Sequence, residues 1–438
     1  MSATNQPRKT GCNNQENDGL MEQIVSQKNM TIAYKRVLGN KGSAGIDGME
    51  VEDLKPYLVE HWSEIKIALQ TSLYYPEMVL QIEIPKPSGG VRLLGIPTVL
   101  DRLLQQAIHQ ILEPIFDPNF SNDSYGFRPK RSARQAVKQS KVYIGCGKRW
   151  IVNVDLSKFF DEVDHDRLLS KIRIKIKDRR VIHLIERYLR VGIMNTGIEE
   201  RRIKGTPQGS PLSPLLSNIV LDELDKELEE RRHLFVRYAD DFQIYVGSKR
   251  AAQRVMLSLE AFIENTLKLK VNKKKSTIDR PWTTNFLGYS FTMDKPVKLK
   301  VSKESIQRFK VKIKELFSKG KGRNLGRFIT ETLNPVIRGW MVYFSASDVK
   351  GFTKGLDMWI RRQLRKVIWQ QLKRNWTRLK ALIKRGLSEE RAVQSTFNQR
   401  GPWWNAGASH MNKAYPKSYF VKLDLLSLHQ IHTKFYLH

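Results

Sequence analysis

The pattern of apolar and polar positions divides the chain at about residue 302 into a part with mixed structure and a part with helices alone. Before this point, short apolar or alternating runs are typical of strands, and longer stretches with apolar residues every three or four positions are typical of helices. Strands are predicted at 79–84, 91–94 and 150–155, with a strand–turn–strand at 234–246. Helices are predicted at 20–73, interrupted by a glycine-rich loop at 42–48, at 101–111, from a Pro/Gly loop at 207–214 to about 230, and at 251–267. This alternation predicts an α+β fold.

The part after residue 302 is predicted to be all-helical. A first helix turns one apolar stripe inward, made of Ile306, Phe309, Ile313, Leu316 and Phe317. Asn334 and Pro335 indicate the start of a second helix, with asparagine as N-cap and proline in the first turn. A third helix over 356–372 turns its apolar residues inward, and its other positions include Arg361, Arg362, Arg365 and Lys366.

The charge of the chain indicates a polyanionic partner. The net charge is +32, and residues 301–400 carry 24 Lys and Arg against 7 Asp and Glu, so this segment alone supplies +17. Six of the nine tryptophans also lie beyond residue 300. Such a surplus repels itself and usually persists where a polyanion neutralises it. Nucleic acid is therefore the predicted partner, and a basic face kept for solubility is the alternative.

Cysteine content and hydropathy argue against two other protein classes. Only Cys12 and Cys146 are present, too few for a disulfide framework or a four-cysteine zinc site. No apolar run approaches the roughly 20 residues of a membrane-spanning helix, and residues 1–9 lack the apolar stretch of a secretory signal. Residues 1–19 are polar and predict a disordered tail. A soluble, cytoplasmic protein without membrane contact is expected.

Acidic residues at the predicted turn in 234–246 are the strongest chemical signal. Asp240 and Asp241 are adjacent between two strand-forming runs, where like charges are costly to crowd unless a cation neutralises them. Asp155 ends the predicted strand at 150–155. If the two elements are neighbours in one sheet, three carboxylates converge on a site suited to two Mg²⁺ ions, as phosphoryl transfer needs. A turn that the aspartates merely shape is the alternative.

Several motifs in this order resemble reverse transcriptases encoded by bacterial group II introns. The motifs are Tyr238-Ala239-Asp240-Asp241 and the segments 207–214, 125–129, 94–102 and 286–291. The resemblance covers about residues 20–438 and implies a right-hand polymerase fold. It implies an N-terminal extension and the start of the fingers at 20–100, fingers and palm at 101–300, a helical thumb (maturase domain) at 301–385 and a small DNA-binding region at 386–438. Many relatives end in an HNH endonuclease that is missing here, so the chain is expected to resemble the class C type.

The resemblance also implies roles for single residues. Asp155, Asp240 and Asp241 would be the metal-site carboxylates. Lys275 would protonate the leaving pyrophosphate, although a solvated charge run over 273–275 is the alternative.

Nucleotide and primer contacts are implied in the same way. The nucleotide site would contain Lys86 and Arg92 for the triphosphate, Phe160 as a steric gate against a ribose 2′-hydroxyl, and Gln208 against the nascent base pair. The primer end would be held by Phe286, Leu287 and Gly288. The nucleic-acid-binding residues of the thumb would include Arg361, Arg362, Arg365 and Lys366. A core aromatic is the alternative for Phe160, and a turn-stabilising amide is the alternative for Gln208.

The expected function is an RNA-directed DNA polymerase that extends a DNA or RNA primer on an RNA template with dNTPs and two Mg²⁺ ions. The resemblance implies that it also acts as a maturase on its own group II intron RNA, in splicing and in retrohoming to target DNA, with nucleoid association during that step. One alternative is an RNA-binding splicing cofactor without polymerase activity. Another is a domesticated reverse transcriptase in repair or phage defence. Phe160 argues against an RNA-dependent RNA polymerase.

Overall fold

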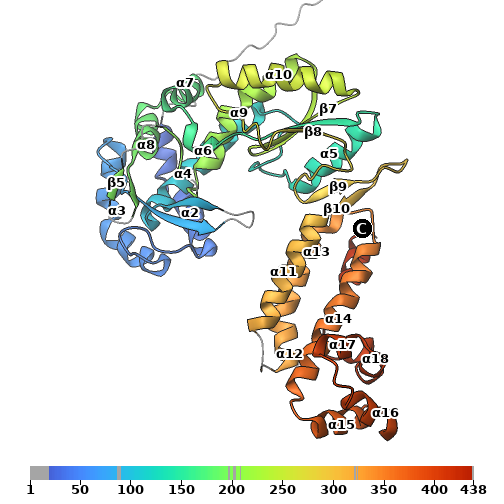
Figure 1. Cartoon of the computed structure of the whole chain (residues 1–438). Helices are drawn as coiled ribbons and strands as arrows, with labels where there is room; N and C mark the ends of the chain where they lie inside the picture. The colour runs from blue at the N-terminus through green and yellow to red at the C-terminus, as the bar shows by residue number, and fades with distance from the viewer. Residues whose placement is uncertain are drawn as a thin grey trace, which may run out of the picture. The chain divides into compact units, whose positions relative to one another are not determined.

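The computed structural model describes residues 19–85, 90–195, 198–200, 204–207, 209–319, 322 and 324–436. Their contacts form two compact units, and many of their elements are labelled in Figure 1. The first unit contains Met1–Ala136 and Lys148–Asp279, and the second contains Val137–Gly147 and Arg280–His438. The predicted tail up to residue 18, together with Lys86 and Gln208, lies outside the described residues.

One sheet of the first unit has the strand order β2-β1-β4-β5. Its strands are β1 Val79–Pro85, β2 Val91–Ile96, β4 Ile193–Asn195 and β5 Ile198–Glu200. β1 pairs with β2 in antiparallel and with β4 in parallel orientation. The strands predicted at 79–84 and 91–94 are thereby confirmed as one antiparallel pair.

A second sheet of the first unit carries the candidate site. Its order is β6-β7-β3-β8, and its strands are β3 Trp150–Val154, β6 Leu234–Tyr238, β7 Asp241–Val246 and β8 Thr277–Asp279. The three pairings are antiparallel. β6 and β7 confirm the predicted strand–turn–strand, and β3 confirms the strand that leads into Asp155.

A row of polar side chains crosses this second sheet at one level. Asn153 stands opposite Gln243 of β7 and Thr277 of β8. Gln243 Nε2 donates to Asn153 Oδ1 at 2.6 Å, and Asn153 Nδ2 donates to Thr277 Oγ1 at 3.1 Å. The five residues 242–246 of β7 are all buried, so apolar alternation does not distinguish the two faces of this strand. The hydrogen bonds of the row therefore help to fix its register.

Several helices of the first unit begin at a side-chain cap. Thr98, Asp164 and Ser248 each accept a hydrogen bond from the backbone N–H three residues on, which satisfies a donor that the helix leaves unpaired. They precede α4 Val99–Phe116, α7 His165–Lys175 and α10 Lys249–Asn265. The other helices of this unit are α1 Leu20–Ile24, α2 Gln27–Asn40, η1 Val51–Asp53, α3 Leu54–Gln70, η2 Asp117–Asn119, α6 Phe159–Glu162, α8 Arg179–Arg190 and α9 Ser213–Glu230. The helices predicted at 101–111, up to 230 and at 251–267 are confirmed as α4, α9 and α10.

In its described residues, the regular structure of the second unit is helical apart from one short strand pair. β9 Tyr289–Phe291 and β10 Leu299–Val301 pair in antiparallel orientation. The helices after them run from orange to red in Figure 1. The helical elements of the unit are α5 Ala133–Gly145 (from Val137 on), α11 Lys303–Lys319, α12 Leu325–Arg327, η3 Phe328–Leu333, α13 Asn334–Tyr343, η4 Phe344–Ala346, α14 Gly351–Gln371, α15 Asn375–Lys384, α16 Glu389–Thr396, α17 Pro402–Gly407, α18 Ser409–Ala414, α19 Lys417–Val421 and α20 Leu428–Tyr436. The α+β fold class, followed by helices alone after residue 302, is confirmed.

α13 begins at Asn334 with Pro335 in its first turn, as predicted, but the predicted N-cap role of Asn334 is wrong. α12, the π-helical turn η3 and α13 follow one another without a break, and Leu333 already has right-handed helical dihedral angles. Pro335 has no N–H to donate to the helical ladder, and the π-helical turn just before it absorbs the interruption. The side chain of Asn334 instead donates to Asp424 O at 2.8 Å and accepts from Leu426 N at 3.0 Å. Asn334 therefore anchors the C-terminal segment. Across the described part of the chain, every helix is too short or too polar to span a bilayer.

Candidate active site

A tight turn between β6 and β7 carries the two adjacent aspartates. Tyr238 pairs with Asp241, so Ala239 and Asp240 form a two-residue loop. Ala239 has φ +59°, a left-handed conformation that is typical of two-residue hairpin turns. Asp240 thereby lies in the loop itself, and Asp241 begins β7.

Asp155 lies beside this turn because β3 pairs with β7. The last pair in their register is Val154 with Phe242. Asp155 follows Val154, and Asp241 precedes Phe242 on the antiparallel partner strand, so the two acidic residues meet at the same end of the sheet. This pairing confirms that the two predicted elements are neighbours in one sheet.

Asp241 has a perturbed carboxyl group. Dehydration of the carboxyl group, together with the like charges of Asp240 and Asp155, raises the pKa of Asp241 to about 6, and the positive charge of Lys275 opposes this rise. Asp241 as a whole residue is solvent-exposed. The strand pairing explains one cause of the raised pKa of Asp241 directly, because it places the like charges of Asp155 and Asp240 next to this carboxyl group.

Lys275 is the basic residue of this cluster. Its Nζ lies 3.7 Å from Asp155 Oδ2, and its side chain is 67 % exposed. The loop that carries it is tied to Asp155 by two backbone contacts: Asn272 N donates to Asp155 O at 2.8 Å, and Asp155 N donates to Ser276 Oγ at 3.1 Å. The three-lysine run is thus held with Lys275 next to the carboxylates.

The acidic cluster suits a hard divalent cation by its chemistry. Carboxylate oxygens are the ligands that such ions prefer, and a cation would relieve the repulsion that raises the pKa of Asp241. Among the described residues, no three His, Cys, Asp or Glu side chains are arranged as a ready metal site. A cation bound here would need further ligands from water and substrate, which Mg²⁺ commonly uses.

Gly126 packs directly behind the aspartate turn. A Cβ atom at this position would lie 2.2 Å from Ala239 N and 2.9 Å from Tyr238 C, so only glycine fits. The carbonyl of Gly126 accepts from Asn218 Nδ2 at 2.9 Å. The motif at 125–129 is therefore part of the structure that supports the turn.

Phe160 belongs to the short helix α6 and is partly buried against the core. Its ring centroid lies 5.3 Å from that of Phe159 in an edge-to-face arrangement. The segment just before Gln208 holds this helix, because Gly205 N donates to Val163 O at 2.8 Å and Thr206 N donates to Phe160 O. The backbone of Phe160 is therefore fixed, while its ring keeps some contact with solvent.

Two regions of the chain match known protein families. Residues 84–291 match the reverse transcriptase (RNA-dependent DNA polymerase) family, and residues 306–386 match the maturase-specific domain of group II introns. Protein YkfC of Escherichia coli (strain K12) is 31 % identical over 299 residues, which cover 59 % of this chain and 78 % of YkfC. The chain belongs to the group II intron reverse-transcriptase family.

A second relative supports the same family. The group II intron-encoded protein LtrA of Lactococcus lactis subsp. cremoris is 34 % identical over 324 residues, which cover 59 % of this chain and 54 % of LtrA. The chain thus spans about half the length of that relative. Among solved structures, telomerase from Candida albicans covers 80 % of this chain and 64 % of its own, with a TM-score of 0.46 and 15 % identity, and it adds nothing to the family assignment.

The predicted nucleotide contacts of the reverse-transcriptase domain are described in part. Arg92 is exposed on β2, where it stands opposite Ile84. Lys86 and Gln208 lie outside the described residues. The roles of these three residues stay predictions.

The predicted primer-end residues lie in the second unit. Leu287 and Gly288 have φ angles of +51° and +80° and form a tight turn, closed by mutual backbone hydrogen bonds of 2.9 Å between Phe286 and Tyr289. Tyr343 Oη donates to Leu287 O at 3.1 Å, which fixes the turn further. Their role in holding a primer stays a prediction.

The four predicted thumb residues on α14 have different environments. Arg365 is buried, donates from Nε to Tyr415 O at 2.9 Å and has its pKa lowered to about 10 by burial and by Arg361. Arg362 lies 4.0 Å from the ring centroid of Trp403 and donates to its carbonyl. Arg361 and Lys366 are partly exposed. The helical pattern placed all four outside the inward-facing apolar set, but the burial of Arg365 gives no support to its predicted contact with nucleic acid.

Sequence reasoning did not single out three residues that shape the site. Gly126 was visible only as a member of the motif at 125–129, and Gly205 lies just outside the motif at 207–214. A glycine between bulky residues is a usable signal of close backbone approach. Arg237 stands between strand-forming residues, directly before the aspartate turn. A charged residue inside an otherwise apolar strand indicates either an exposed edge or a buried partner, and the pattern alone does not say which.

Proposed function

We propose that this protein is an RNA-directed DNA polymerase that adds deoxynucleotides to a DNA or RNA primer on an RNA template. The observation that carries the proposal is the register of β3 against β7, which brings Asp155 next to Asp241 within the region that matches reverse transcriptases. A carboxylate pair at the end of two neighbouring strands, with a third on the adjoining turn, suits phosphoryl transfer better than a purely structural role.

In this proposal Asp155, Asp240 and Asp241 hold the divalent cations, most simply two Mg²⁺ ions. When bound, such ions lower the pKa of a primer hydroxyl and neutralise charge on the departing pyrophosphate. The protein itself contributes rigid placement, because both strands that carry the carboxylates are paired along their length.

Other residues of the first unit would handle substrate and proton. Lys275, beside Asp155, can hold a proton near the leaving group. Arg92 carries its charge on an exposed part of β2, where a guanidinium can fork onto phosphate. Phe160 can exclude a ribose 2′-hydroxyl by steric overlap, since its backbone is fixed and its ring is partly exposed.

Primer extension on an RNA template tests the polymerase. We expect Mg²⁺-dependent incorporation of dNTPs by the wild type and a loss of at least roughly 100-fold in Asp240→Asn, which removes a charge that the cations need. Asp166→Asn is the matched control, because Asp166 is an acidic residue of the same unit whose side chain is 87 % exposed. No extension by the wild type, or equal activity of both variants, would contradict the proposal.

The second unit supports a further role as a maturase for intron RNA. Its residues 306–386 match the maturase-specific domain, and the segment 301–400 carries a net charge of +17. The proposed partner is the group II intron RNA that encodes the chain, with target DNA engaged during retrohoming; the class C lineage stays a prediction.

A self-splicing assay tests the maturase. The protein should raise the splicing rate of its own intron at low Mg²⁺, and Asp240→Asn should do so equally, because splicing does not use the polymerase carboxylates. If the reading frame lies outside any intron, the maturase role falls and a domesticated reverse transcriptase in repair or phage defence takes its place. A protein that promotes splicing but extends no primer would be the RNA-binding cofactor without polymerase activity.

A further inference from the structure

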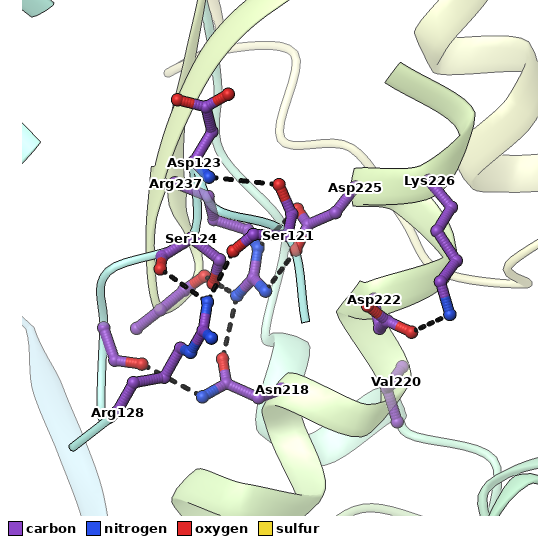
Figure 2. Close-up of polar contacts among 12 residues, drawn as sticks. Ser121, Asp123, Ser124, Arg128, Asn218, Val220, Asp222, Asp225, Lys226 and Arg237 are labelled. Atoms are coloured by element: carbon purple, nitrogen blue, oxygen red, sulfur yellow. Dashed lines mark hydrogen bonds and ion pairs between the residues drawn. The ribbon is translucent and has the colours of Figure 1, made fainter. Parts of the chain in front are cut away.

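Arg237 is a fully buried charge in the strand that leads into the aspartate turn. Its side chain has 0 % exposure, as has that of Asp225 on α9. The two form a bidentate ion pair, with Nε donating to Asp225 Oδ1 at 2.7 Å and Nη2 donating to Asp225 Oδ2 at 2.5 Å. Figure 2 shows the guanidinium of Arg237 between Asp225 and Asn218.

The remaining donors of Arg237 are directed at the turn and its support. Nη1 donates to Ala239 O at 3.0 Å and to Asn218 Oδ1 at 3.0 Å. Asn218 in turn donates from Nδ2 to Gly126 O at 2.9 Å. One guanidinium thereby joins α9, the left-handed residue of the turn and the glycine that packs behind it.

The backbone of Arg237 is held from the same side. Its N–H donates to Asp123 O and its carbonyl accepts from Tyr125 N, both at 2.9 Å. The segment 121–128 is itself tied down by Arg128, which donates to Ser124 O at 3.0 Å and to Asp117 Oδ1 at 2.6 Å. β6, the strand before the turn, is thus hydrogen-bonded to the segment 121–128, which is itself held in place by hydrogen bonds.

Stability alone is a poor reason for this arrangement. Removing two charges from water is costly, and apolar residues of similar volume often replace a buried ion pair without loss of stability. Apolar residues could not hold the carbonyl of Ala239, whose φ of +59° is uncommon outside glycine. What the ion pair provides, and an apolar pair could not, is a fixed position for Ala239, the residue directly before Asp240.

We infer that Arg237, oriented by Asp225 and Asn218, is a positioning residue that sets the Asp240–Asp241 turn for divalent-cation binding. The inference rests on the proposed function for its catalytic consequence, but not for its structural one. Because Arg237 is fully buried, it acts through the Ala239 carbonyl and not by contact with substrate.

Arg237→Lys is the direct test, because lysine keeps the charge and loses the fork that serves Asp225 and Ala239 together. We expect Mn²⁺ affinity of the nucleic-acid-free protein to fall roughly tenfold, and kcat for primer extension to fall roughly 10- to 100-fold with little change in the KM for dNTP, as for a misplaced catalytic group. Mn²⁺ titration followed by electron paramagnetic resonance gives the first readout, with Asp240→Asn as the variant that defines the site.

Asp178→Asn is the matched control for a general loss of stability. Asp178 is a buried carboxylate of the same unit that pairs with Arg180 and caps α8, away from the turn. It should lower the Tm and leave Mn²⁺ affinity and kcat per folded molecule unchanged. If Arg237→Lys does not fold, Asn218→Ala removes one donor to Gly126 and one acceptor of Arg237, and should show the same split at smaller size.

The outcomes separate the two proposals. Unaltered Mn²⁺ affinity in a folded Arg237→Lys protein, or a loss no larger than in Asp178→Asn, would overturn the positioning role. The positioning role would also be overturned if the wild-type protein bound no Mn²⁺, or bound it equally well after Asp240→Asn. In either case the turn would hold no cation for Arg237 to position. Mn²⁺ behaviour as expected, without primer extension by the wild type, would leave the positioning role standing and remove the polymerase.

Discussion

The backbone N–H of Thr206 donates a hydrogen bond of 2.6 Å to the carbonyl of Phe160. Gly205, directly before it, has φ +89°, and a Cβ atom there would lie 2.7 Å from Phe160 O and 2.8 Å from Asp161 Cα. Gly205→Ala should therefore displace Phe160 and lower the selectivity for dNTP over NTP by roughly tenfold. Single-nucleotide incorporation measures this ratio. Gly247→Ala is the control, because nothing lies near its Cβ position; equal selectivity in the two variants would refute the coupling.

The ring of Phe160 should itself set sugar selectivity. We expect Phe160→Ala to raise incorporation of ribonucleotides by roughly 10- to 100-fold, since the steric overlap with a 2′-hydroxyl is removed. Phe160→Leu keeps part of the bulk and should fall between alanine and the wild type. Competing dNTP and NTP in a primer-extension assay give the ratio. A selectivity that does not follow side-chain size would assign Phe160 to the core instead.

Lys275 should contribute more to catalysis than its two neighbours. It lies 3.7 Å from Asp155, whereas the described ion pairs include none to Lys273 or Lys274. Lys275→Ala should lower kcat by roughly 100-fold if Lys275 acts as the general acid, and Lys273→Ala and Lys274→Ala should lower it by less than about threefold. Rapid-quench single-turnover kinetics would compare the three. Equal effects would identify the run as a general binding surface.

Acid should weaken the contact between α1 and α8. Hydrogen bonds from Arg180 lower the pKa of Glu22. For Asp178, burial acts to raise the pKa, but the hydrogen bonds from Arg180 and from the N–H of Met21 outweigh burial, so the pKa of Asp178 is also lowered. Groups with lowered folded-state pKa values stabilise above their ordinary values, here 4.5 and 3.8, and lose this contribution as the pH falls through the folded values.

Arg180→Met tests this dependence. The substitution should lower the free energy of unfolding by about 1 kcal/mol at pH 7, a small value because the ion pair is partly exposed. The loss should become progressively smaller below about pH 4. Urea denaturation at pH 7 and pH 3.5 measures the difference. Arg327→Met, which breaks a more exposed pair with Glu331, should cost less at pH 7. A cost for Arg180→Met that is independent of pH would assign its effect to packing.

RNA binding by the second unit should separate the basic residues of α14. The affinity for RNA falls with salt, and each phosphate contact that is lost makes the slope of log affinity against log salt shallower by about 0.7–0.9. Replacing Arg361 and Lys366 with glutamine should therefore make the slope shallower by about 1.5. Arg365→Gln should lower the Tm and leave the slope unchanged, because Arg365 is buried against Tyr415. Filter binding across a salt series would show an unchanged slope in the double variant if the RNA lies elsewhere.

Much of the site was predictable because its signals are local. Strand-forming residues around Asp240 and Asp241 predict the hairpin, and the apolar run before Asp155 predicts its neighbour. Long-range polar contacts were not predictable, because periodicity reports which face a residue occupies and not what lies against it. Arg237 finds Asp225 on a separate helix, and no pattern in either element encodes the match.

Arg365 and Asn334 both lie in environments that the local pattern did not indicate. The helical repeat places Arg365 among basic residues, but α14 packs against the C-terminal segment on more than one side, so part of its polar face is also buried. Asn334-Pro335 marks the first residues of α13, but a π-helical turn precedes them, so Asn334 does not act as an N-cap. In both cases the tertiary environment outweighs the local preference.

The polar row Asn153–Gln243–Thr277 has a consequence for how this enzyme family can vary. Apart from Asp241 and Gln243, β7 consists of apolar residues that are buried on both faces of the sheet. Exchange among these apolar residues does little to fix the alignment of the strands, whereas the hydrogen bonds of the row penalise a slip. A slip of one residue would turn Asp155 to the opposite face from Asp241. Descendants of this chain should therefore tolerate aliphatic drift in β3 and β7, whereas a single-residue insertion or deletion in either strand would separate the acids while leaving a folded protein.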